Sequence, residues 1–118
     1  MAAATVITNT SLVLNTFAAM PATAAVEATN GALVTAAADH KMLLIAENAS
    51  ADTAKTVTIK AGNGIQGISD LALSIPAATT QCIVIESMKF VNTSGTNKGK
   101  ILLTGTDANI KIACVVLP

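Results

Sequence analysis

The chain has 118 residues, which is enough for one domain with a core of its own. Apolar residues make up 52% of the chain, so we expect a folded core and exclude a disordered chain. Charged residues make up only 12%, the net charge is zero and aromatic residues make up 2%. The chain therefore lacks both the cationic surface that binds nucleic acid and the aromatic faces on which bases and sugars stack.

Residues 1–30 are rich in Ala and Thr, and they hold neither a helical nor a strand period over a long stretch. β-Branched residues interleave with the alanines and Pro21 interrupts the run, which disfavours a helix. We therefore expect residues 1–30 to form an extended N-terminal arm. Its apolar side chains are candidates for contacts with another protein chain or a second subunit outside the folded body, and they are Val6, Ile7, Leu12, Val13, Leu14 and Phe17.

A secretory signal is not expected in this arm. Residues 1–20 contain no Lys or Arg, and Asn15 and Thr16 break the apolar run that a signal would need. No stretch approaches the ~20 apolar residues of a membrane span. We therefore expect synthesis in a cytoplasm without export.

Residues 31–118 have the pattern of a folded β domain. After the turn pair Asn30-Gly31, short β-branched runs recur about every ten residues, with clusters of Gly, Asn, Asp, Ser and Pro between them. No amphipathic helix separates these runs. We expect an all-β fold, an antiparallel β-sandwich of about seven to eight short strands. The expected strands are Ala32–Ala36, Lys41–Glu47, Lys55–Ala61, Leu71–Ile75, Gln81–Glu86, Lys100–Thr104 and Ile110–Leu117.

These strands are of two kinds. Residues 56–60 and 71–75 alternate between apolar and polar side chains, as strands with one solvated face do. Residues 42–45, 82–85 and 113–117 are apolar on both faces. Because a two-layer sandwich buries only one face of each strand, the second face needs a cover. The N-terminal arm or another protein chain could supply it.

The sequence offers no catalytic, cofactor or metal site. Cys82 and Cys114 lie in apolar runs and are interpreted as buried free thiols, although a disulfide stays open if their strands are neighbours. Two Cys and one distant His40 do not make a zinc site. His40 follows Asp39 without a nucleophile at any recognisable spacing, which is typical of a turn and not of a general base.

Residues 62–67, GNGIQG, match the G-x-G-x-x-G pattern of dinucleotide-binding loops. That site needs a helix directly after the glycines to hold the pyrophosphate. Residues 68–75 have a strand pattern instead, so we interpret the glycines as a connection between strands. The protein is therefore not expected to be an enzyme.

The order of strands and turns over about residues 41–118 resembles the small capsid decoration, or auxiliary head, proteins of tailed bacteriophages. The runs that carry the resemblance are TVTIKAG (56–62), LALSIPA (71–77), IVIESMKF (83–90) and IKIA (110–113). The resemblance implies a β-sandwich module, made in the host cytoplasm, that binds in many copies to the surface of an assembled shell and cements neighbouring subunits.

The resulting hypothesis is a structural virion protein that decorates and stabilises a bacteriophage capsid through many repeated apolar contacts. Its expected partners are the major capsid protein and further copies of itself, for example in a trimer, with no nucleic acid and no membrane. Two alternatives stay open. One is a phage fibre, spike or tail-associated β module, and the other is an adhesive or ligand-binding β-sandwich domain, which the absence of Trp and Tyr disfavours.

Overall fold

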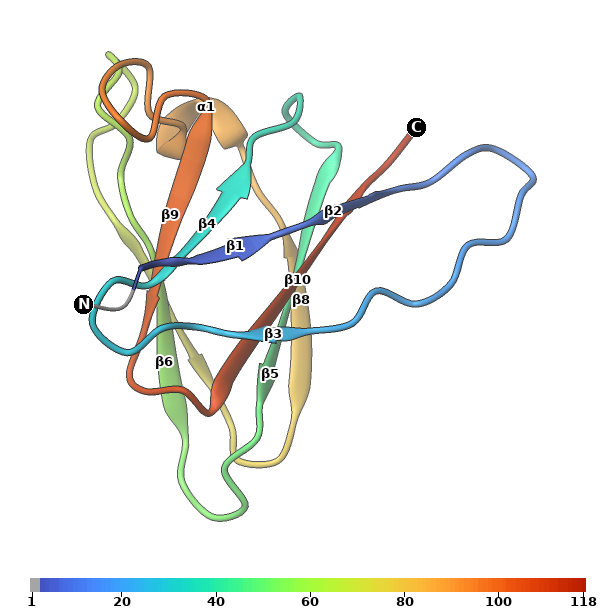
Figure 1. The fold of residues 1–118 in the computed structure, drawn as a ribbon, viewed down its shortest axis with the longest axis vertical. Coiled ribbons are helices and arrows are strands. Elements are labelled where there is room, and N and C mark those ends of the chain that lie inside the picture. Colours follow the sequence, from blue (N-terminus) through green and yellow to red (C-terminus); the bar gives the residue numbers. More distant parts are fainter. Residues whose placement is uncertain (1–2) are drawn as a thin grey trace.

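The computed structural model describes residues 3–118, which form ten strands and one four-residue helix (Figure 1). The strands form two sheets that pack against each other, and the short helix α1 (Ser87–Phe90) lies at one end of them. The expected all-β class is confirmed. Each of the seven strands expected over residues 31–118 is present, with ends that differ by at most two residues.

The first sheet has the strand order β1-β4-β9-β6-β7. Its members are β1 (Thr5–Ile7), β4 (Ala32–Thr35), β9 (Lys100–Gly105), β6 (Lys55–Ile59) and β7 (Leu71–Ile75). The alternation read in the sequence for residues 56–60 places Val57 and Ile59 of β6 on the face that meets the second sheet, and β9 buries Ile101 and Leu103 on the same face.

The second sheet has the order β2-β10-β5-β8, and β3 pairs with β10 beside this path. Its members are β2 (Asn9–Ser11), β10 (Ile110–Val116), β5 (Met42–Asn48), β8 (Thr80–Val84) and β3 (Ala24–Ala25). β2 pairs with the end of β10 and β3 with its beginning, while β5 takes the other edge of β10. The two short strands therefore share one edge of β10, which with β5 is one of the two longest strands.

The expectation of a wholly antiparallel sandwich of about seven to eight strands is only partly right. β1 pairs with β4 in parallel and β2 pairs with β10 in parallel, so both sheets are mixed. The extra strands are β1, β2 and β3, and all three come from residues 1–30. Each is only two or three residues long, which is too short to show a period in the sequence.

Residues 5–11 cross from one sheet to the other. β1 completes the edge of the first sheet, and β2 follows after a single residue and completes the edge of the second sheet. This segment therefore joins the two sheets along one side of the molecule (Figure 1). On the opposite side, β7 and β8 are both terminal strands, and within residues 3–118 no strand pairs with their outer edges.

The core lies between the two sheets and is apolar. Its largest fully buried side chains include Met42, Ile59, Ile101, Leu103 and Ile112. Burial of such side chains contributes about 1.5–3 kcal/mol each and is the main stabilising term.

β10 is buried on both faces, as its sequence predicted. Ile112 and Cys114 face the core, whereas Ala113 and Val115 are also buried although they do not belong to the core cluster. Thr23, at the base of β3, donates a hydrogen bond to Glu47 on β5, 3.0 Å away. On the outer face of the neighbouring strands, Leu43 and Ile45 are half-buried and Cys82 and Val84 are exposed. The cover expected for residues 42–45 and 82–85 is therefore incomplete within residues 3–118.

Cys82 and Cys114 are free thiols, but only Cys114 is buried. The expectation that both are buried is wrong for Cys82, because it lies on the outward face of the terminal strand β8. They lie on β8 and β10, and β5 runs between those two strands. Cys114 is opposite Leu44 and Cys82 is opposite Ile45. Because adjacent residues of β5 point to opposite faces, the two thiols also lie on opposite faces of the sheet, so no bridge can form.

Candidate functional site

Residues 12–23 leave the body as a long loop, here called the projecting loop. Figure 1 shows it beyond the ends of β2 and β3, away from the two packed sheets. Residues 13–20 are all exposed to solvent. The exposed side chains include Val13, Leu14, Phe17 and Met20, and the side chain of Phe17 is fully exposed.

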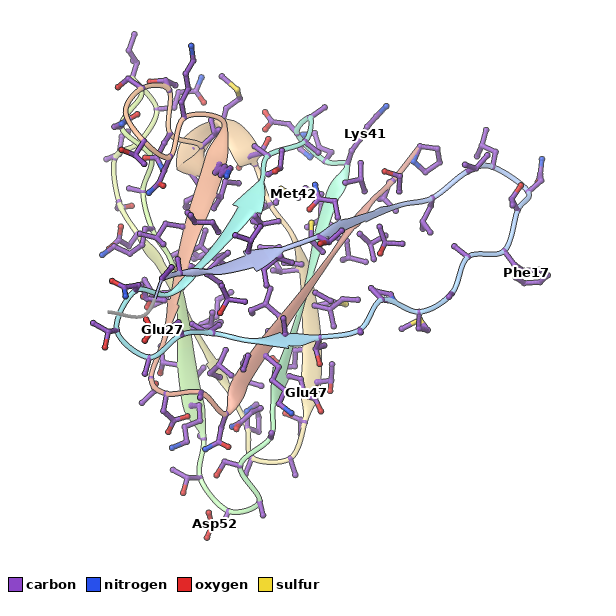
Figure 2. All side chains as sticks on the ribbon, viewed as in Figure 1. Phe17, Glu27, Lys41, Met42, Glu47 and Asp52 are labelled. Carbon is purple, nitrogen blue, oxygen red and sulfur yellow. The ribbon has the colours of Figure 1, made fainter. Side chains whose placement is uncertain are left out.

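The projecting loop is held at both of its ends. The amide of Leu12 donates a hydrogen bond to the carbonyl of Val116 at 2.9 Å, and the Thr23 hydroxyl donates to Glu47. Between these anchors Thr16 makes hydrogen bonds within the loop, from its amide to the carbonyl of Val13 and from its hydroxyl to the carbonyl of Leu14. The body therefore fixes where the loop starts and ends, and its apolar tip stands free (Figure 2).

The projecting loop is also free of charge. No Asp, Glu, Lys or Arg occurs before Glu27, so none of the twelve residues of the projecting loop has a charged side chain. Exposed apolar side chains scattered singly need no explanation, but here four lie within eight consecutive exposed residues. Such a segment is typical of a surface that binds another protein.

The structure separates the six arm residues singled out in the sequence. Ile7 is 5% exposed and packs in the chain's own core, and Leu12 is half-buried at the base of the loop. Val6 is exposed on β1, which is part of the body. Only the remaining three lie together on the projecting loop, and these are Val13, Leu14 and Phe17.

A second feature lies on the opposite side, along the outer edges of β7 and β8. There the two sheets diverge and leave a cavity of about 170 Å³ that is open at its mouth. Leu73 on β7 and Ile83 on β8 flank it, and core residues such as Val57 and Leu44 form its floor. Gln81, which is exposed, is the polar side chain at the mouth. No charged residue lines this cavity.

A wider hollow continues from the same edge toward α1. It has a volume of about 400 Å³ and shares Ile83 with the first cavity. Ile68 and Val84, both exposed, lie on its rim, together with the ionised side chains of Asp70, Glu86 and Lys89. Both hollows therefore lie along the outer edges of β7 and β8. The smaller one, of about 170 Å³, is the one without a charged residue in its lining.

The residues considered for catalysis have structural roles. The Asp39 carboxylate accepts hydrogen bonds from the Met88 amide at 3.0 Å and from the Ser87 hydroxyl at 3.1 Å, at the start of α1. These bonds hold the pKa of Asp39 below its ordinary value, the Met88 amide being the main cause. His40 is exposed at a turn with φ of 64°. Among residues 3–118 no cluster of three metal-ligating side chains exists.

The glycine motif also has a structural explanation. Residues 62–70 connect β6 to β7, and no helix follows them. A side chain on Gly67 would collide with the Gly62 carbonyl, and one on Gly62 would collide with the Val91 carbonyl. The glycines therefore allow three backbone segments to pack closely. No helix in residues 3–118 has the length and apolar character needed to span a membrane.

The sequence analysis missed several exposed apolar residues. Met20 follows two alanines on the projecting loop, Ile65 and Ile68 lie in the turn-rich connection between β6 and β7, and Met88 lies on the short helix α1. A large apolar residue inside a predicted turn is the signal that could have found them, because turns lie at the surface.

The comparisons with known proteins give no relative: no family model, no curated protein and no solved structure matches this chain. The functional argument therefore depends on the surfaces described above.

Proposed function

We propose that the protein is a structural component of a virion, a β-sandwich with mixed sheets that decorates and stabilises a bacteriophage capsid. It would bind at the capsid surface in many copies, to the major capsid protein and to copies of itself. The observation that carries this proposal is the projecting loop, an uncharged segment with four exposed large apolar side chains that the chain's own body leaves uncovered.

Physical reasons favour assembly over catalysis. An exposed apolar loop is an aggregation liability in a free monomer, so its presence is best explained by a partner that covers it. The two ends of the loop are fixed on β10 and β5, which lowers the entropy that is lost when the loop binds. Single contacts of this size are weak, but many identical contacts on a symmetric shell act together.

Two other functions compete with this proposal. A fibre, spike or tail-associated module would use the same chemistry at a lower copy number. An adhesive or ligand-binding module is disfavoured for sugars, because the only exposed aromatic side chain among residues 3–118 is Phe17 and the chain has no Trp or Tyr.

The test is particle association with a loop variant. Residues 13–20 are replaced by a Gly/Ser linker of equal length, which keeps both anchors, and the control replaces residues 93–98, a loop without large apolar side chains. Particles from the native source are stripped, mixed with each protein and separated on a density gradient. We expect hundreds of copies per particle for the unaltered protein and the control, and at least a roughly tenfold loss for the 13–20 variant. Equal occupancy of all three proteins would overturn the role of the loop, and a wholly soluble unaltered protein would overturn the virion assignment.

A further inference from the structure

The projecting loop and the cavity between β7 and β8 lie on opposite edges of the molecule. The second sheet runs β2-β10-β5-β8, and the loop leaves from the β2 and β3 side while the cavity opens at β8. In the first sheet β1 and β7 are likewise the two terminal strands. The apolar protrusion therefore starts from one edge of the sandwich, and the apolar recess opens at the other edge.

We propose that the cavity between β7 and β8 is the binding site for Phe17 from the projecting loop of a second copy of this chain. The inference rests on the proposed function, since it names one receiving surface for the same loop. It adds that the chain assembles with itself, head to tail, before or during attachment to any shell.

The size of the cavity agrees with this occupant. Its volume is about 170 Å³, and an apolar cavity of about 150 Å³ in another protein stays dry and binds benzene. A phenyl ring is therefore the kind of group that such a space accepts. The chain has two Phe residues; Phe90 is buried in its own core, so Phe17 is the ring that is available.

The charges agree as well. The loop has no ionisable side chain, and the cavity is lined by apolar residues with only Gln81, Ser74 and Cys82 as polar or thiol groups. Insertion therefore desolvates no charge, which is the main cost that prevents apolar segments from entering charged clefts. The wider hollow beside α1 carries Asp70, Glu86 and Lys89, so it fits the uncharged loop less well.

One loop contact is smaller than a standard interface, so it is weak by itself and becomes stable only where ring closure makes several contacts act together. A Phe side chain buries about 150–250 Å², and Val13, Leu14 and Met20 lie beside it on the same loop. A stable interface needs about 800 Å² from each partner. Head-to-tail contact gives every copy two such loop contacts, one at each edge, and the repeated contact closes a ring or extends a filament.

The contact is tested by disulfide trapping with Ala18→Cys and Gln81→Cys combined in a Cys82→Ser background, which keeps the Phe17 ring because Ala18 is the exposed residue next to it on the loop. Cys114 does not interfere, because burial removes its thiol from solvent and raises its pKa to about 11. Mixtures of ¹⁴N- and ¹⁵N-labelled protein are oxidised mildly, resolved on a non-reducing gel and analysed by mass spectrometry. We expect a ladder of linked multimers whose linked peptides contain positions 18 and 81 from different chains.

The control pairs Val6→Cys with Gln81→Cys in the same background, because Val6 is also exposed but lies on β1. Trapping no faster than this control, or links only within one chain, would overturn the proposal. So would a wild-type chain that sediments as a monomer at its highest soluble concentration.

A second experiment avoids new cysteines. In sedimentation velocity, Phe17→Ala should raise the dissociation constant of self-association roughly 10- to 100-fold, and Phe17→Leu should raise it less. Ala46→Leu, which fills the cavity from within, should weaken association similarly without lowering the melting temperature. Ala72→Leu, at an exposed position on β7, should leave association unchanged. If Ala46→Leu and Ala72→Leu behave alike, the cavity is not the receiving site.

These results are separable from the particle experiment. A chain that binds particles but does not trap in solution would remove the head-to-tail contact and keep the virion role. A chain that traps through positions 18 and 81 but never binds particles would keep the head-to-tail contact and remove the virion role, and the protein would then be a self-assembling module of another kind.

Discussion

Asn48 is the polar residue whose loss we expect to cost the most stability. It is 1% exposed at the end of β5. Its side-chain amide donates to the carbonyls of Ile75 and Thr53, both at 3.0 Å, and its side-chain oxygen accepts from the Ser50 amide at 2.9 Å. One side chain thus ties the end of β5, the turn that follows it and the end of β7.

Asn48→Ala would leave these three backbone groups without their partner. A buried polar group that loses its hydrogen bond costs about 1–3 kcal/mol, and the groups nearer the surface regain part of that from water. We therefore expect the free energy of unfolding to fall by about 2–4 kcal/mol. With a urea dependence near 2 kcal/mol per M, the midpoint of unfolding should fall by about 1–2 M.

The assay is urea unfolding followed by far-UV circular dichroism, since the chain has no Trp or Tyr for fluorescence. Asn63→Ala is the matched control, because Asn63 is exposed and also makes three hydrogen bonds, to Ser94 and Thr93. Water can replace these bonds, so we expect a loss below about 1 kcal/mol. If the two variants lose the same stability, burial is not what makes Asn48 important.

Asn48→Asp separates hydrogen bonding from shape. A carboxylate has nearly the same size but cannot donate, so its oxygens would face the carbonyls of Ile75 and Thr53. Burial and these carbonyls should raise the pKa of the new carboxyl in the folded state above its unfolded value. The folded state then binds the proton more tightly, so the penalty should be largest at neutral pH and should shrink as the pH falls. A penalty independent of pH would refute this account.

Three further predictions concern single positions. Gly31 has φ of 78°, and a side chain there would collide with a carbonyl of β9, so Gly31→Ala should lower the free energy of unfolding by about 3 kcal/mol or more. Gly95 has φ of 85° but open space around it. Gly95→Ala should therefore cost only about 1–2 kcal/mol in the same unfolding assay. A thiol reagent at mildly alkaline pH should modify Cys82 in the folded protein and Cys114 only after unfolding; rapid reaction of both would contradict the burial of Cys114. Lys55 donates a hydrogen bond to Asp107 and holds the pKa of the Asp107 carboxyl below its ordinary value. The stabilisation that the ionised carboxylate contributes is therefore present above the ordinary pKa of an aspartate and is lost as the pH falls through the lowered value. Asp107→Asn should flatten the acid branch of the curve of unfolding free energy against pH.

Much of the body could be predicted from the sequence, because local side-chain chemistry decides where these strands begin and end. Leu71–Ile75 has the predicted bounds, and Lys100–Gly105 differs from its prediction by one residue. Alternating β-branched and polar residues favour strands, and turn residues such as Gly31 end them. The absence of charge from residues 1–26 is likewise a property of the sequence alone.

The arrangement of residues 1–30 was decided only by the tertiary structure. Three strands of two or three residues gain their stability from the edges of β4 and β10, which are more than twenty residues away in the chain. No local period can encode such a partner, or the parallel direction of pairing. The same pairing fixes Leu12 and Thr23 and thereby determines which apolar residues project, while the divergence of β7 and β8 creates the recess. The positions of the strands follow from local side-chain chemistry. The projecting loop and the recess depend on which strands, distant in the sequence, pair with one another.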